Sequence, residues 1–248
     1  MPMQGKPGQD NPGKQRAPHP PAPAQHPLQF AKHEFTVIGD AALYWPEYRA
    51  LIVADLHLEK ASSYAVTGQM LPPYDSHATL SAMDGLIHAC AANHIICLGD
   101  NFHDSGGEER LCGEAARLLR DLTSRHRWSW ITGNHDPALQ ARWGGETWPE
   151  MACGGIMLRH EAAPDWPGYE ISGHFHPKWR VNNGQRSVTR RCFTISQRKI
   201  IMPAFGVLTG GMDAGEAARI AEPGLTYRGG GEALIALPQK LTRFALGK

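Results

Sequence analysis

The sequence predicts an α/β domain, and two observations carry that prediction. Five short apolar runs, rich in β-branched residues and next to glycine or a polar motif, are typical of buried strands. Two longer segments between these runs have apolar residues at helical spacing. A chain of 248 residues can form one such domain with a sizeable core.

The expected strands and helices alternate along the chain. The strands are expected at residues 51–54, 95–98, 128–131, 155–158 and 169–171. One helix is expected over 76–92, with one apolar face formed by Leu80, Met83, Leu86 and Ile87. The other is expected over 108–124, with an apolar face formed by Leu111, Ala115, Leu118, Leu119 and Leu122. Both faces are expected to pack on the sheet.

Polar motifs follow the five expected strands, where α/β folds place ligands and catalytic groups. In chain order they are Asp55-Leu56-His57, Gly99-Asp100, Gly133-Asn134-His135-Asp136, His160, and Gly173-His174-Phe175-His176. A single pair of such residues would mean little, and a lone histidine is more often structural than a metal ligand. Five motifs in this order predict a hydrolytic centre that holds two divalent metal ions.

The donor types indicate which metals suit this centre. Carboxylate oxygens, imidazole nitrogens and the amide oxygen of Asn134 suit Mn²⁺, Fe, Zn²⁺ or Mg²⁺. No cysteine lies in the five motifs, which argues against a thiolate site. Asp100 is the natural bridging ligand, because it is the only acid in its motif and lies centrally in the ligand order. We expect two ions, with Mn²⁺ as the first candidate.

The motif series resembles that of the calcineurin-like metallophosphoesterase superfamily, and no ligand of that pattern is missing. The resemblance implies a four-layer αββα sandwich of two mixed sheets flanked by helices, with the metals at the carboxyl edge of the sheets. It implies one metal held by Asp55, His57, Asp100 and His176, and a second held by Asp100, Asn134, His160 and His174. It also implies that His135 faces the scissile phosphate as a proton donor or charge stabiliser, oriented by Asp136.

Four longer sequence segments are similar to those of bacterial ligase-associated DNA damage response endonucleases: residues 54–60, 99–104, 173–177 and 202–211. This similarity covers residues 35–237. It implies phosphodiester hydrolysis in DNA repair, with a DNA ligase, a helicase and an exonuclease as partners, and a homodimer as the assembly. A phosphodiesterase for cyclic or 2′,3′-linked small nucleotides is the alternative. A non-catalytic scaffold is disfavoured, because such proteins lose ligands that this chain keeps.

Basic residues near the motifs are candidates for substrate contacts. Lys60 could reach a phosphate or be a solvated charge, and His103 could contact substrate or be an ordinary surface histidine. A basic cluster also follows the last motif: Lys178, Arg180, Arg186, Arg190, Arg191, Arg198 and Lys199, with Trp179 among them. It is either the solvated face of a hairpin or a groove that tracks a phosphate backbone, with Arg190 and Arg191 as contacts.

The two ends and the overall composition set further limits. Repeated prolines predict a disordered tail over residues 1–30, followed by one domain over 31–240 and a short basic end over 241–248. No apolar stretch is long enough to predict a membrane span. An odd number of cysteines, five, without a signal peptide predicts a cytoplasmic protein. The net charge of +1 does not by itself predict nucleic-acid binding.

Overall fold

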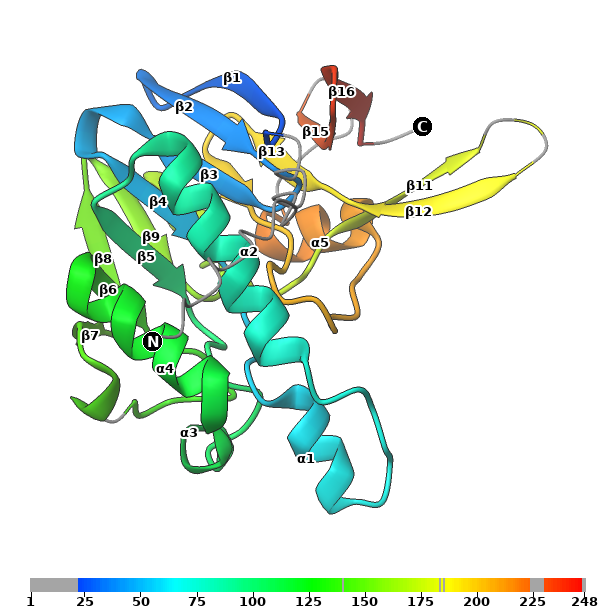
Figure 1. Ribbon diagram of the computed structural model, residues 1–248. Helices are drawn as coiled ribbons and strands as arrows, with labels where there is room; N and C mark the ends of the chain where they lie inside the picture. The colour runs from blue at the N-terminus through cyan, green and yellow to red at the C-terminus, as the bar shows by residue number, and fades with distance from the viewer. Residues whose placement is uncertain (1–21, 140, 183, 185, 224–229, 247–248) are drawn as a thin grey trace, which may run out of the picture.

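The computed structural model describes residues 22–139, 141–182, 184, 186–223 and 230–246. In this part of the chain, two seven-stranded mixed sheets pack face to face between outer helices (Figure 1). The first sheet has the order β1 (Gln25–Phe30), β2 (His33–Ile38), β3 (Ala42–Trp45), β4 (Ala50–Val53), β5 (His94–Leu98), β6 (Arg127–Ile131) and β7 (Glu146–Trp148). The second has the order β16 (Lys240–Ala245), β15 (Gly231–Leu237), β13 (Phe193–Ser196), β14 (Lys199–Ile201), β10 (Tyr169–Ser172), β9 (Ile156–Arg159) and β8 (Glu150–Cys153).

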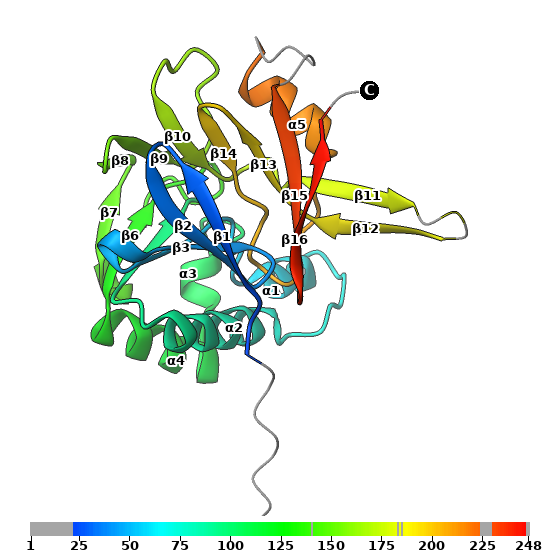
Figure 2. The ribbon, with the colours of Figure 1, turned by 90° about the horizontal axis from the view of Figure 1, so that it is seen from above.

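Helices complete the outer layers, and a separate hairpin projects from the body. The helices are α1 (Lys60–Val66), α2 (Asp75–Cys90), α3 (Gly107–Arg110), α4 (Gly113–Arg125) and α5 (Ala214–Ala221), with 3-10 turns η1 (Pro46–Tyr48) and η2 (Ala141–Trp143). Helices α2 and α4 lie side by side on the first sheet, and α5 covers the second (Figure 2). Strands β11 (Lys178–Asn182) and β12 (Ser187–Arg191) form the hairpin (Figure 1). The predicted αββα sandwich of two mixed sheets is confirmed.

Strand β4 shows how the sequence produces these layers. Leu51 and Val53 face the core beneath α2 and α4, whereas Ile52 faces the core between the two sheets. Successive side chains of a strand point to opposite faces, so a strand buried on both faces is apolar throughout. The five apolar runs of the sequence correspond to β4, β5, β6, β9 and β10, as predicted.

Parallel pairing brings the motifs to one region of the molecule. Strands β4, β5, β6 and β7 are parallel neighbours, and β10 is parallel to both β9 and β14. Their carboxyl ends therefore lie along one edge of each sheet. The five motifs follow the carboxyl ends of β4, β5, β6, β9 and β10.

Three boundaries differ from those predicted. The helix expected over 108–124 is divided into α3 and α4, because Cys112 is extended and Gly113 has a left-handed φ of 60°. The predicted tail also reached too far, since Gln25–Phe30 forms β1 and pairs with β2; residues 1–21 lie outside the described residues. At the other end, most of the short basic end predicted over 241–248 belongs to β16, which pairs with β15. Among the described helices, none combines the length and apolar composition needed to cross a bilayer.

Candidate metal centre

Two groups of predicted ligands lie next to each other beyond the carboxyl ends of the parallel strands. The first group is Asp55, His57 and His176, whose potential ligand atoms all lie within 4.8 Å of one another. His176 Nε2 is 3.3 Å from an Asp55 carboxylate oxygen and 3.3 Å from His57 Nε2. The second group is Asp100, His160 and His174, whose potential ligand atoms also lie within 4.8 Å of one another. Asn134 joins it, with Oδ1 2.9 Å from His160 Nε2.

Asp100 belongs to the second group and also approaches the first. One of its oxygens is 3.8 Å from His57 Nε2 in the first group, and the other is 3.4 Å from His160 Nε2 in the second. The side chain is almost fully buried. This position gives one carboxylate access to both groups, which is the geometry that a bridging ligand requires.

Backbone conformation marks the same residues. Ten non-glycine residues of the described chain have a positive φ, and five of them are the predicted ligands Asp55, His57, Asp100, His174 and His176. Residues other than glycine adopt this region at an energetic cost, and such strain is concentrated at functional sites. The strained backbone at these five residues fits turns that direct the ligand side chains toward one shared centre.

Glycines allow the turns to approach one another. A Cβ atom on Gly133 would lie 2.2 Å from the backbone nitrogen of Asp100, and one on Gly99 would lie 2.4 Å from His160 Nδ1. Neither position can hold a larger residue without displacing a predicted ligand. The glycines of the G-D and G-N-H-D motifs are therefore needed for close packing of the centre.

The protonation states of the histidines suit metal binding. Burial, and to a smaller extent the neighbouring His176, together lower the pKa of His57 to about 2, so this imidazole is neutral. His160 Nδ1 donates a hydrogen bond to the Leu98 carbonyl at 3.1 Å, because a carbonyl can only accept. In the neutral ring, His160 Nε2 then carries a lone pair, and it faces the oxygens of Asn134 and Asp100. Such a convergence of acceptor atoms fits a bound cation.

His135 lies at the open side of this centre. Its side chain is 40% exposed, and its Nε2 is 3.9 Å from Asp100. His135 Nδ1 donates to the His103 carbonyl at 2.7 Å, so its Nε2 is the nitrogen that can exchange a proton with a substrate.

Asp136 does not orient His135, contrary to what the family resemblance implied. Its carboxylate instead accepts backbone N–H groups of Asn101, Phe102 and Gly133 at 2.7–3.1 Å. Burial raises the pKa of Asp136 to about 6, although these three donors oppose that shift. Asp136 therefore ties the G-D turn to the G-N-H-D turn, and the His103 carbonyl takes over the orientation of His135.

Comparison with models of protein families matches residues 48–211 to calcineurin-like phosphoesterases. The matched segment is more than half of the chain and contains all five motifs. The chain belongs to this family. Because its buried aspartate and histidine groups are also suited to two metal ions, the protein is a metal-dependent phosphoesterase.

Solved structures provide a second comparison. This phosphoesterase is similar to the nuclease MPE of Pseudomonas putida, with 25% sequence identity and a TM-score of 0.68, over 89% of this chain and 100% of that one. It also matches YfcE, a phosphoesterase from E. coli, with 12% identity and a TM-score of 0.38, over 80% of this chain and 99% of that one. Comparison with curated proteins finds no match.

An aromatic stack borders the phosphoesterase centre. The ring of His103 lies between those of His135 and Tyr64, with centroid distances of 5.4 and 5.8 Å and interplanar angles of 22° and 29°. Lys60 Nζ lies 5.9 Å from the centroid of Tyr64. His103 Nδ1 also lies 3.4 Å from Nδ1 of the predicted ligand His57, and Lys60 lies at the far end of the stack. Tyr64 was not predicted, because its only sequence signal is its place one helical turn after Lys60.

The basic cluster predicted after the last motif does not form one surface. Lys199 is buried and pairs with Glu170, and Arg198 lies 3.6 Å from Glu222. Arg190 is exposed on the hairpin. Arg191, on the opposite face of β12, donates to the carbonyls of Phe205 and Gly206 at 3.1 and 2.5 Å. Arg191 was predicted as a phosphate contact, but its guanidinium is committed to the backbone.

The Arg191 contacts support the metal centre indirectly. Phe205 and Gly206 donate their N–H groups to the carbonyls of Ala54 and Asp55. Arg191 thus binds the loop at Phe205 and Gly206, and this loop is hydrogen-bonded to the turn that carries Asp55. We expect Arg191→Met to lower the free energy of unfolding by about 2 kcal/mol, because two carbonyls lose a charged donor. Denaturant unfolding measures this change, with Arg190→Met as the control. An equal effect of the two substitutions would contradict the assignment.

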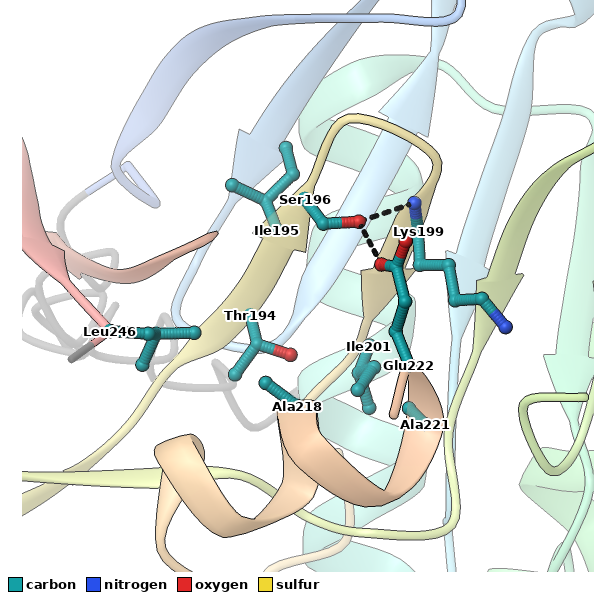
Figure 3. Close-up of a pocket in the computed structure, with 9 residues that line it drawn as sticks. All are labelled: Thr194, Ile195, Ser196, Lys199, Ile201, Ala218, Ala221, Glu222 and Leu246. Carbon is teal, nitrogen blue, oxygen red and sulfur yellow. Dashed lines mark hydrogen bonds between the residues drawn. The ribbon is translucent and has the colours of Figure 1, made fainter. Parts of the chain in front are cut away.

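A small cavity of about 10 Å³ lies between α5 and the second sheet (Figure 3). Some of the polar groups around it hydrogen-bond to one another. Ser196 Oγ donates to Glu222 at 2.6 Å and accepts the Lys199 N–H at 3.0 Å. The remaining lining includes apolar side chains of Ile201 and Ala218. A space of this size holds at most about one water molecule, so it is not a substrate site.

Proposed function

We propose that this phosphoesterase is a manganese-dependent phosphodiesterase that cleaves nucleic acid as an endonuclease. The observation that carries the proposal is the pair of ligand groups on either side of Asp100, next to an exposed His135. Similarity to a bacterial nuclease over 89% of the chain supports a nucleic-acid substrate.

In this proposal, the residues divide between two metal positions. Asp55, His57, Asp100 and His176 would hold one ion, and Asp100, Asn134, His160 and His174 would hold the other. When bound, two such ions supply Lewis acidity at the scissile phosphate and an activated water as nucleophile. Oxygen and nitrogen donors without thiolate are compatible with Mn²⁺, and Fe, Zn²⁺ and Mg²⁺ share that donor preference to differing degrees.

His135 would act on the leaving group. Its Nδ1 proton is retained by the His103 carbonyl, so the transferred proton must come from Nε2. General acid catalysis of this kind therefore uses the protonated imidazole. His103 stacks on His135, and Lys60 lies near Tyr64, which stacks on His103. Both would contact the substrate, and Arg190 would meet a longer substrate on the exposed hairpin.

The cellular role follows from the proposed chemistry and the motif resemblance. A nuclease of this kind would act in cytoplasmic DNA repair beside a DNA ligase, a helicase and an exonuclease. A homodimer would be the working assembly. We also propose that one domain extends from β1 to β16, since both strands pair within the two sheets.

The test compares two substrates in parallel. Supercoiled plasmid and bis(p-nitrophenyl) phosphate are incubated with the full chain and Mn²⁺. The proposal predicts nicking of the plasmid and hydrolysis of the small diester, and both should stop with a chelator. Cleavage of the small diester alone would contradict the endonuclease proposal and favour a phosphodiesterase of small nucleotides.

A further inference from the structure

Two lysines lie on the rim of the centre, on elements distant in sequence. Lys60 begins α1 and Lys178 begins β11, and both are half-buried. Lys60 lies three residues after His57, and Lys178 lies two residues after His176, so each follows a predicted ligand of the first metal position.

The first turns of α2 connect the two segments. Ser76 accepts the N–H group of Glu59, the residue before Lys60, at 2.8 Å. Thr79, one helical turn later, accepts the N–H group of Val207 at 3.2 Å. The same loop continues to Thr209, whose carbonyl accepts a hydrogen bond from Lys178 Nζ at 3.2 Å. The two lysines are therefore held on adjoining segments of one rim.

Among the described residues, the positive charges of Lys60 and Lys178 are not paired directly with carboxylates. In the part of the chain that the structure describes, neither ammonium group has a carboxylate oxygen within 4.0 Å. Burial lowers the pKa of Lys60, and the charge of Lys178 lowers it further, while Asp75 opposes both effects. Two ammonium groups that disfavour each other's charge would be stabilised by a bound anion.

We infer that Lys60 and Lys178 bind the phosphate next to the scissile one in a nucleotide chain. This inference rests on the proposed function, because it assigns a second phosphate position to the same site. Lysine ammonium groups are compact charges with several donors, so they tolerate the varied torsions of a sugar–phosphate backbone. A substrate with two successive phosphates would then bind better than an isolated diester.

Binding of defined nucleotides tests this inference without turnover. Isothermal titration of the manganese-loaded full chain compares thymidine 3′,5′-bisphosphate with thymidine 5′-monophosphate and 3′-monophosphate. We expect the bisphosphate to bind about tenfold more tightly than either monophosphate, because charge-assisted hydrogen bonds are strong. The double variant Lys60→Met with Lys178→Met should lose this preference. The double variant Lys60→Arg with Lys178→Arg, which keeps both positive charges, should retain most of it.

Lys32→Met is the matched control. Lys32 is exposed in the turn between β1 and β2, at the edge of the first sheet opposite the ligands, and should leave the preference intact. Equal affinity of the wild-type protein for the bisphosphate and both monophosphates would overturn the inference, as would an unchanged preference in the double methionine variant. An intact preference without plasmid cleavage would instead overturn the endonuclease proposal and leave the second phosphate position standing.

Discussion

Replacing Asp100 with asparagine is expected to abolish turnover and to remove at least one metal ion. Asp100 is the buried carboxylate that reaches both ligand groups, so the amide loses the charge that would neutralise two cations. Lewis acid stabilisation is worth several kcal/mol, which corresponds to a rate loss of about a thousandfold or more. Hydrolysis of bis(p-nitrophenyl) phosphate and elemental analysis of bound manganese measure the two effects.

Asp104→Asn is the matched control for this substitution. Asp104 lies in the same loop, but its carboxylate pairs with Arg110 at 2.7 Å and accepts the Gly106 N–H group. The control should keep two equivalents of metal and most of the activity. A fully active Asp100→Asn protein with two bound ions would contradict a bridging role.

His135→Ala should lose turnover while keeping its metals. His135 is outside both ligand groups around Asp100, but it presents Nε2 beside them. General acid catalysis contributes about 10²–10⁴-fold, so a loss of that size is expected for nucleotide substrates with poor leaving groups. Kinetics on a dinucleotide and on bis(p-nitrophenyl) phosphate measure it, with bound manganese as the control for an intact centre.

The comparison of leaving groups separates two roles for His135. A p-nitrophenolate leaves without protonation, so the small diester should be affected much less than the dinucleotide if His135 is a proton donor. Equal losses on both substrates would instead indicate stabilisation of phosphoryl charge. Full activity on the dinucleotide would remove His135 from the mechanism.

The fold and the location of the centre could be predicted because their signals are local. Apolar runs at β4, β5, β6, β9 and β10 mark strands buried on both faces, and each is followed by a polar motif. Parallel pairing then places these motifs at the carboxyl edges, wherever the strands lie in the sequence. The gathering of Asp55 and Asp100 follows from this rule, whereas the second sheet, which carries His160, was placed against the first only by the family resemblance.

Other features depend on tertiary contacts that no local pattern reveals. The left-handed backbone of Asp55 and His57 is imposed by packing, since neither residue type demands it. Arg191 was expected to bind phosphate, but a loop distant in sequence supplies carbonyls for its guanidinium. Asp136 was expected to hold its neighbour His135, but both its oxygens are engaged by N–H groups of adjacent turns. Strand β1 was hidden by prolines and polar residues, and it forms because β2 offers a paired edge.

The central claim is that this phosphoesterase holds two metal ions that share Asp100. The most direct measurement is an anomalous difference map from a crystal of the full chain soaked with Mn²⁺. The claim predicts two peaks, one among Asp55, His57, His176 and Asp100, and one among Asn134, His160, His174 and Asp100. A single peak, or peaks that do not share Asp100, would contradict it.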